Sequence, residues 1–324
     1  MPKWNRFTAP CRALAFPAGL ISPNSVLEFT TDDLAHALFA TGRAPGDEVR
    51  HGWASVWEFV HRTSLIPAYV RRTGGGALVK SALALELDRS EKVTLSYSLG
   101  QALTEIFCER KLGVTHLLHM DRYASRWGVT FTATRKRADL FGLAPDGWVV
   151  AEAKGRSNGV EAALPKTLIA QKRSVKSISG ERPWLALGCV AAFPPHRNEL
   201  SITAVDPDED GPEPISIDLD LDRYMLAYYE PFLAAVAAGT PEEAQDQPYL
   251  TSRIGLLDMR VGIRRDIAAR VRLAAQGEVS GLYGSIGELL GAGVEPDEVA
   301  TAFPDGTLIG TEWTDAISLN DWRF

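Results

Sequence analysis

The sequence predicts an α/β protein in which helices flank a mixed β-sheet, and three segments carry this prediction. Residues 98–112 place apolar side chains at steps of three and four, which is typical of an amphipathic helix. Residues 137–143 and 148–154 are strand-like runs joined by a four-residue turn. Residues 185–193 form a continuous apolar run, as in a strand buried on both faces of a sheet.

The first third of the chain, residues 1–97, is predicted to be a helical region. Residues 31–40 form a short helix behind Thr30, and residues 53–70 form a longer one. The apolar residues Trp53, Val56, Trp57 and Val60 recur at helical spacing and predict the buried stripe of the longer helix. The rest of residues 1–50 is expected to be irregular.

The centre, residues 98–205, is predicted to hold the main sheet. After a helix that stops at Gly113, we expect strands at 116–120 and 129–134, followed by the two strands of the hairpin. A helix at about 160–177 and strands at 185–193 and 200–205 follow. The predicted order is therefore helix, strands, helix, strand, strand.

The last third, residues 206–324, reads as an acidic linker followed by an α/β region. We expect a helix at 224–238, a strand at 253–263 and a helix at 264–276. The linker is rich in proline and acidic residues, which is typical of an exposed loop.

Composition excludes several classes of protein. Hydrophobic residues make up 45% of the 324, enough for an ordinary core. No window reaches eighteen uninterrupted apolar residues, and no signal peptide is recognisable, so we expect a cytoplasmic protein without a membrane span. Three widely spaced cysteines describe neither a disulfide framework nor a zinc ribbon.

The net charge of −7 is unevenly distributed along the chain. From residue 105 to 185 there are 14 basic and 8 acidic residues, a net charge of +6. From 201 to 250 there are 1 basic and 12 acidic residues, a net charge of −11. The centre could therefore attract a polyanion although the whole chain is acidic.

Asp139, Glu152 and Lys154 are the residues most suggestive of chemistry. Side chains two apart on a strand share a face, so Glu152 and Lys154 should project together. If Pro145 and Asp146 are the central turn residues, Asp139 lies opposite Glu152, with Cβ atoms about 5 Å apart. A bulge at the turn would shift this register by one residue.

Two neighbouring carboxylates repel each other unless a cation lies between them. Magnesium commonly binds through one or two carboxylates, several waters and a substrate phosphate. Asp139 and Glu152 would hold such an ion, which would polarise a scissile phosphate and activate a water. Lys154 would orient that water or stabilise developing charge.

The segment ADLFGLAPDGWVVAEAKGR resembles the PD-(D/E)XK nuclease superfamily, with the restriction-endonuclease-like fold. Asp139 matches its aspartate and Glu152-Ala153-Lys154 its ExK, whereas Ala138 replaces its proline. The resemblance covers about 98–205 and implies a helix before a mixed sheet and another after the ExK strand. It also implies an acidic residue on the first helix, here Glu105 or, less well, Glu109, as a further metal ligand, and a catalytic glutamine, here Gln171.

The resemblance implies a metal-dependent nuclease that uses Mg²⁺, with Mn²⁺ as a substitute, and cleaves DNA, more as an endonuclease than as an exonuclease. Restriction or defence against phage is the role it favours. Basic residues on either side of the motif would contact the nucleic-acid backbone. These are Arg135, Lys136, Arg137, Lys172, Arg173 and Lys176.

Two alternatives stay open at the level of sequence. Asp139 can be a polar turn residue, with Glu152 and Lys154 an exposed ion pair on an edge strand. The fold can also persist without activity, as a binding protein whose acidic stretch from Asp206 to Asp246 mimics DNA or docks a basic partner. The last third could equally contact DNA or a second copy of the chain in a homodimer.

Overall fold

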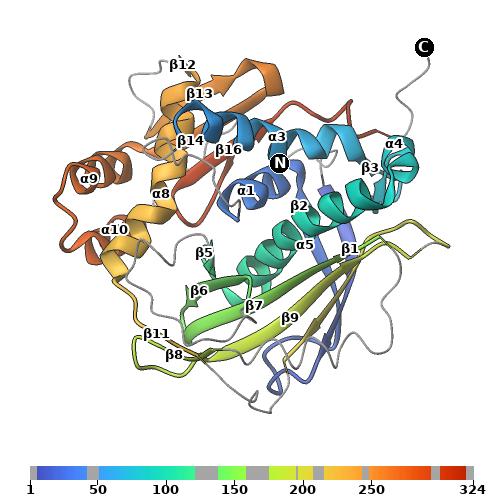
Figure 1. Ribbon diagram of the computed structural model, residues 1–324, viewed down its shortest axis with the longest axis horizontal. Coiled ribbons are helices and arrows are strands. Elements are labelled where there is room, and N and C mark those ends of the chain that lie inside the picture. Colours follow the sequence, from blue (N-terminus) through green and yellow to red (C-terminus); the bar gives the residue numbers. More distant parts are fainter. Residues whose placement is uncertain are drawn as a thin grey trace.

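The computed structural model describes residues 6–41, 51–120, 138–157, 175–194, 196–206, 215–242, 248–292 and 300–318. These residues form a mixed α/β structure with a curled seven-stranded sheet and a smaller five-stranded sheet (Figure 1). Across the larger sheet the strands are β2 (Asn24–Thr30), β1 (Arg6–Leu14), β10 (Ser201–Val205), β9 (Leu185–Ala192), β7 (Gly147–Arg156), β6 (Leu140–Ala144) and β5 (His116–His119).

The larger sheet mixes parallel and antiparallel pairs. β5, β6 and β7 form an antiparallel meander, and β7 runs parallel to β9. β9 and β10 are antiparallel, β10 and β1 are parallel, and β1 and β2 are antiparallel.

The smaller sheet is wholly antiparallel and lies in the C-terminal part of the chain. Its strands, in order, are β12 (Thr240–Glu242), β13 (Tyr249–Ile254), β14 (Met259–Arg264), β16 (Thr307–Thr311) and β15 (Thr301–Ala302). Two further pairs are β3 (Val70–Arg72) with β4 (Leu78–Lys80), and β8 (Val175–Ile178) with β11 (Ile215–Ile217).

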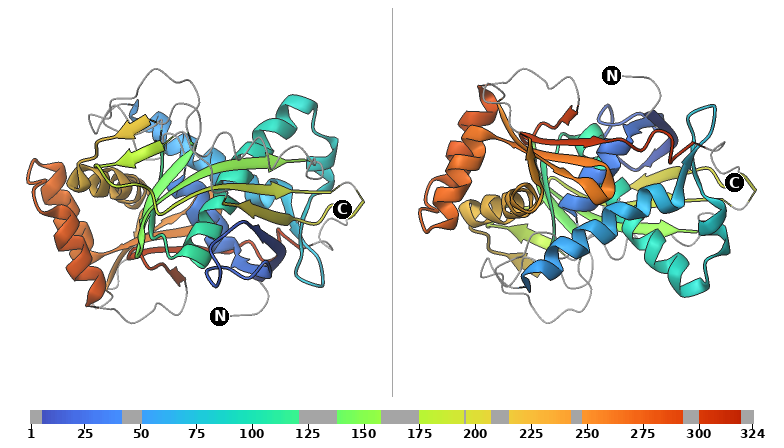
Figure 2. Two further views of the ribbon diagram at one scale, coloured as in Figure 1. Left: turned by 90° about the horizontal axis from the view of Figure 1, so that it is seen from below. Right: turned by 90° about the horizontal axis from the view of Figure 1, so that it is seen from above.

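The described helices connect the two sheets into one structure. α5 lies along the larger sheet and packs on α1, whereas α8 packs on the smaller sheet (Figures 1 and 2). One large apolar core includes residues of both sheets and of the helices that pack on them. The helices are α1 (Thr31–Ala40), α3 (Trp53–Tyr69), α4 (Ala82–Glu86), α5 (Arg89–Leu112), α8 (Leu221–Ala238), α9 (Arg265–Ala275) and α10 (Leu282–Gly291), with a 3₁₀ turn at Gly255–Leu257.

Glycines set the position of α5 on the sheet. A Cβ atom on Gly155 of β7 would overlap the backbone carbonyl of Ser96, and one on Gly100 would lie 2.5 Å from the Gly155 nitrogen. Because successive strand residues point to opposite faces, the side of β7 that Gly155 presents to α5 is also that of Ala153 and Ala151. Glu152 and Lys154 therefore project from the opposite face.

The prediction that residues 1–50 are irregular apart from one helix was wrong. β1 and β2 lie in the larger sheet, with alternate residues of β1 buried, among them Phe7, Ala9 and Cys11. Pro10 obscures this period in the sequence, because proline lacks the N–H that a central strand needs. The strand tolerates it because β1 pairs with β10 only from Cys11 onward.

Two predicted elements in the second half also differ. A helix was expected at 160–177. Its part up to residue 174 lies outside the described residues. Its last residues are not helical, because Val175–Ile178 is strand β8. The single strand expected at 253–263 is the hairpin β13–β14, which turns at Gly255–Leu257 with Asp258 in the left-handed region (φ 44°). The strand expected at 129–134 lies outside the described residues.

The prediction that Trp53 and Trp57 belong to the buried stripe of α3 was wrong. Trp53 and Trp57 are 70% and 61% exposed, whereas Phe59, Ile66 and even Arg62 are buried. The helix itself was predicted correctly, but its two large tryptophans do not mark its buried face. Among the described residues, no helix combines the length and the apolar character needed to cross a membrane.

Candidate functional site

The β6–β7 hairpin has the register that the turn sequence predicts. Ala144 pairs with Gly147, and the ladder continues to Leu140 opposite Ala151. Gly147 adopts a positive φ of 131°, a conformation that side-chain-bearing residues rarely adopt. The alternative of a bulge that shifts the pairing by one residue does not occur.

Asp139 lies one residue before β6, which places it beside Glu152 on β7. The Ala153 N–H donates a hydrogen bond to Asp139 Oδ2 at 2.9 Å. Ala153 lies between Glu152 and Lys154, so this bond holds the Asp139 carboxylate against the short ExK segment. The structure thus brings the three residues of the predicted motif together.

Glu152 is buried at the end of an apolar run, with 2% of its side chain exposed. Its Oε1 accepts from Lys154 Nζ in a close ion pair. Its Oε2 is buried and has no hydrogen-bond partner in the part of the chain that the structure describes. A buried carboxylate oxygen without a donor is unfavourable, and a cation is one way to satisfy it.

The environment of Glu152 favours its protonated form when no cation is present. Burial is the largest cause, and together with the negative charge of Asp139 it raises the pKa of Glu152 to about 7, although the Lys154 ammonium opposes the shift. Lys154 is 24% exposed and so lies on the solvent side of the pair. The site therefore combines two adjacent carboxylates with one lysine that can reach solvent.

Glu105 does not join this site. It is on α5, which faces the other side of β7, and its carboxylate lies 3.6 Å from His36 Nδ1 on α1. Glu105, Glu109 and His36 form a cluster whose ligand atoms all lie within 4.8 Å of one another. The prediction that Glu105 shares a metal ion with Asp139 and Glu152 therefore disagrees with the structure, because helical phase directs it toward α1 rather than toward the sheet.

Only one of the remaining predicted site residues lies in the described part of the chain. Gln171, Lys172 and Arg173 lie outside the described residues, as do Arg135, Lys136 and Arg137. Lys176 is described, exposed on β8. The predicted nucleic-acid contacts thus stay predictions.

No pattern in the sequence indicated the partners of His36. Its Nε2 lies 3.1 Å from Asp305 Oδ2 and 3.1 Å from Thr307 Oγ1, across 269 and 271 residues of chain. Tyr228 also donates to Asp305, at 2.6 Å. A lone histidine on a helix carries no motif, so only the fold identifies this buried cluster.

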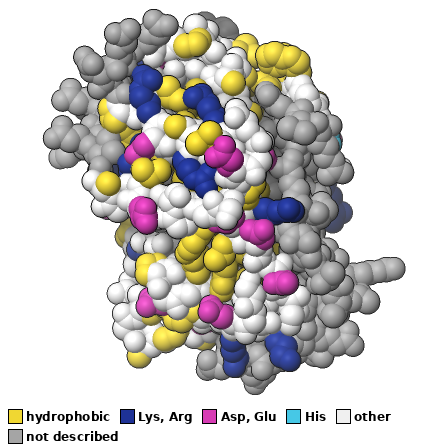
Figure 3. Space-filling view, turned by 90° about the vertical axis from the view of Figure 1, so that its left-hand side faces the viewer, with side chains coloured by type: hydrophobic (Ala, Val, Ile, Leu, Met, Phe, Trp, Pro, Cys, Tyr) yellow, Lys and Arg dark blue, Asp and Glu magenta, His cyan; other side chains and the backbone are white. Residues whose placement is uncertain are grey.

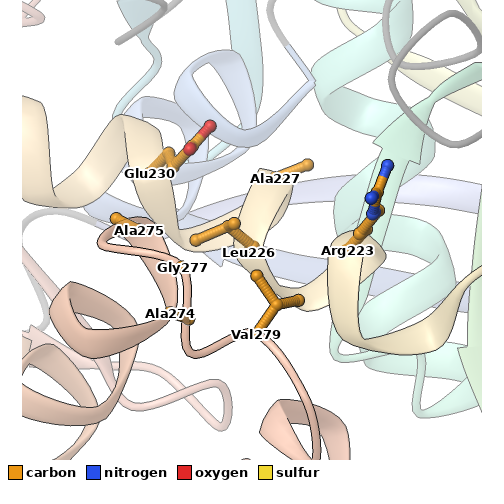
Figure 4. Close-up of a pocket in the computed structure, with 8 residues that line it drawn as sticks. All are labelled: Arg223, Leu226, Ala227, Glu230, Ala274, Ala275, Gly277 and Val279. Carbon is orange, nitrogen blue, oxygen red and sulfur yellow. The ribbon is translucent and has the colours of Figure 1, made fainter.

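A cavity lies elsewhere, between α8 and the segment after α9. It has a volume of about 330 Å³. Arg223 and Glu230 extend from α8 away from Ala274 and Val279, and the remaining lining is apolar (Figure 4). No pair of catalytic groups faces this cavity among its lining residues.

The face on the side of α9 and α10 has mixed charge. Lys or Arg and Asp or Glu side chains are interspersed over it and do not gather by sign (Figure 3). The described part of this face therefore offers no basic surface of the kind that binds nucleic acid. No protein-family model, no curated protein and no solved structure matches the chain.

Proposed function

We propose that the chain is a metal-dependent nuclease that hydrolyses phosphodiester bonds, with DNA as its substrate. The proposal places Asp139 and Glu152 as the metal ligands and Lys154 as the residue that assists the chemistry. It favours an endonuclease of the PD-(D/E)XK type. A role in restriction or defence against phage is part of the proposal and rests on the resemblance alone.

The convergence of Asp139 and Glu152 is the observation that carries the proposal. Asp139 is hydrogen-bonded to the Ala153 N–H, next to Glu152, and Glu152 Oε2 is buried without a described partner. Two adjacent carboxylates, one of them with an unsatisfied oxygen, are a donor set that hard divalent cations prefer. The residues present therefore fit Mg²⁺, or Mn²⁺ as its substitute.

Each of the three side chains would have a separate role in catalysis. A divalent ion bound there would supply positive charge to the phosphate and lower the pKa of a bound water. Asp139 and Glu152 would hold their oxygens in place, fixed by the Ala153 N–H and by burial. Lys154 would leave its ion pair with Glu152 when a cation replaces it, and its ammonium would then orient the water or neutralise charge on the phosphate.

The arrangement of the elements supports the same proposal. Helix α5 precedes the meander of β5, β6 and β7, and β9 lies parallel to β7, which is the order of a helix before a mixed sheet that the resemblance implies. The net charge of +6 between residues 105 and 185 supports a polyanionic substrate. The resemblance also implies a helix after β7, which falls outside the described residues.

Cleavage of circular and linear DNA in Mg²⁺ or Mn²⁺ tests the proposal. The native chain should cut both, and Glu152→Ala and Lys154→Ala should each lose most of the activity. Asp146→Asn is the matched control, because it alters an exposed carboxylate in the turn of the same hairpin, away from Asp139 and Glu152. Equal cleavage by all variants, or no cleavage by the native chain in either metal, contradicts the proposal.

The second candidate is a catalytically inactive binding protein of the same fold, whose acidic stretch docks a basic partner or mimics DNA. The Lys154–Glu152 ion pair favours its lack of activity. Lys154 then serves as the counterion of Glu152 without a metal, through Oε1. The acidic stretch that would mimic DNA is described only in part, with Asp220 about half exposed at the start of α8. A gel-shift assay separates the two candidates, since a DNA-binding enzyme releases DNA as salt rises, whereas an acidic mimic binds none.

A further inference from the structure

The buried cluster of His36, Glu105 and Glu109 lies at the junction of three elements far apart in the sequence. His36 is on α1, the two glutamates are one helical turn apart on α5, and Asp305 precedes β16 of the smaller sheet. The side chains of His36 and Glu105 are 2% and 5% exposed. Charged groups this deeply buried require compensation.

The hydrogen bonds of His36 leave one ring nitrogen directed at the two glutamates. Nε2 is engaged by Asp305 Oδ2 and Thr307 Oγ1, each at 3.1 Å. Nδ1 has no hydrogen-bond partner among the described residues and lies 3.6 Å from Glu105 Oε1. A carboxylate that accepts from one ring nitrogen while the other faces a ligand set is the usual arrangement of a metal-binding histidine.

The ring of His36 is also held in a fixed orientation. Phe303 stacks on it with centroids 3.9 Å apart and an interplanar angle of 12°. Asp305 is itself fixed, because Tyr228 and the Thr307 N–H donate to its two oxygens at 2.6 and 2.8 Å. Such support holds Nδ1 in one position, which favours a ligand over a mobile side chain.

The unsatisfied atoms and the spacing point to a cation. Glu105 Oε2 is buried without a described partner, and His36 Nδ1 has only its 3.6 Å ion pair with Glu105 Oε1. Tetrahedral ligands at about 2.0–2.1 Å from zinc lie about 3.4 Å from one another. The 3.6 Å between His36 Nδ1 and Glu105 Oε1 is close to that value, and Glu109 lies within 4.8 Å of both.

We propose that His36, Glu105 and Glu109 bind one divalent transition-metal ion, with Zn²⁺ as the expected ion, in a site separate from that of Asp139 and Glu152. One imidazole with two carboxylates suits zinc better than magnesium, which prefers oxygen ligands alone. The ion would join α1 to α5, and Asp305 would orient the histidine from the smaller sheet.

The local charges agree with a bound cation. The acidic groups Asp33, Glu105 and Glu109 act on Arg110, which lies 2.6 Å from Asp33 and 3.7 Å from Glu109. Without a metal, the pKa of Glu109 is raised to about 8, first by burial and then by Glu105, and that of His36 is raised well above its ordinary value by Asp305 and Glu105, whose effect exceeds that of burial.

Zinc binding by the full-length, chelator-stripped protein tests this site. The probe is Zn²⁺ alone, measured by calorimetry and by metal content after gel filtration, with Co²⁺ absorption as the spectroscopic readout. The native chain and Glu152→Gln should both retain one high-affinity Zn²⁺ in this site. Glu109→Gln should weaken that binding roughly 100-fold or more, because removal of a ligand costs at least as much as removal of a supporting contact.

Two choices of variant keep the test decisive. Glu109→Gln keeps the size and shape of the side chain, so it should fold, and circular dichroism checks this. Glu288→Gln on the exposed face of α10 is the control for loss of one negative charge and should bind Zn²⁺ like the native chain. Absence of tight Zn²⁺ binding by the native chain, or unchanged binding by Glu109→Gln, overturns the proposal, as does its loss in Glu152→Gln alone.

Discussion

The Asp139 carboxylate accepts a hydrogen bond from the Ala153 N–H, 2.9 Å away, in the strand that carries Glu152 and Lys154. This one bond ties the residue before β6 to the middle of the ExK segment. The hairpin backbone therefore helps to fix the position of the Asp139 carboxylate.

Replacement of Asp139 by asparagine should abolish cleavage while the fold is kept. The amide has the same shape but lacks the charge that holds a cation, so activity should fall by about 100-fold or more. Asp146→Asn is the matched control, because Asp146 is exposed in the turn of the same hairpin. Loss of activity in both variants, or in neither, contradicts a specific role for Asp139.

Lys154 should matter for cleavage and not for metal binding. Its ammonium is the present partner of Glu152, so Lys154→Ala should leave Mn²⁺ affinity equal or higher while it lowers the rate of cleavage. Titration with Mn²⁺ followed by electron paramagnetic resonance measures the first quantity, and single-turnover cleavage the second. A variant that loses metal binding and activity together would instead mark Lys154 as part of the structure of the site.

Lys176 should act only through the nucleic-acid backbone. It is exposed on β8, so Lys176→Ala should weaken DNA binding in all sequences and lower the slope of log affinity against log salt by roughly 1. Fluorescence anisotropy at several salt concentrations measures this slope. An unchanged slope means that DNA does not contact this strand.

Acidity should stabilise the metal-free protein through Glu152. Its folded pKa of about 7 exceeds the unfolded value near 4.5, so the stabilising effect of its proton is complete below pH 4.5 and lost as pH rises through 7. The effect is roughly 3 kcal/mol at most, from 1.36 kcal/mol per pKa unit. Urea denaturation at pH 5.5 and 8 should therefore show a smaller pH effect in Glu152→Gln than in the native chain.

Divalent metal should reverse this pH dependence. A cation must displace the proton of Glu152, so Mg²⁺ affinity and cleavage should both rise between pH 6 and 8. Identical Mg²⁺ half-saturation at the two pH values would argue against Glu152 as a ligand.

The close contact of α5 with β7 should make Gly155 intolerant of any side chain. Gly155→Ala places a Cβ atom against the Ser96 carbonyl, which is backbone and cannot move aside, so we expect a loss of about 3 kcal/mol or failure to fold. Gly284→Ala on α10 meets nothing within 4 Å and should be neutral or stabilising by up to about 1 kcal/mol. Urea denaturation compares the two.

Local signals in the sequence predicted the hairpin, its register and the meeting of Asp139 with Glu152. This succeeded because turn chemistry fixes a two-residue loop and the loop fixes every cross-strand pair. Helix α1 was likewise predicted with its bounds from a threonine cap at its start, and the structure shows that Thr30 forms a capping box with Asp33.

Long-range packing explains the elements and contacts that were not predicted from the sequence. β1 was not predicted because Pro10 breaks the strand pattern and because its partner β10 lies almost 200 residues away. Glu105 was assigned to the nuclease-like site on its chain position, whereas the phase of α5 is set by the Gly100–Gly155 contact. The bond between His36 and Asp305 joins residues 269 apart, which no local pattern encodes.

Anomalous diffraction from crystals soaked in Mn²⁺ tests most directly whether Asp139 and Glu152 share a cation. We predict a peak of anomalous density within about 2.2 Å of a carboxylate oxygen of each residue. This peak should be absent from crystals of Asp139→Asn. A map with no peak between these two carboxylates, at a Mn²⁺ concentration that supports cleavage, would contradict it.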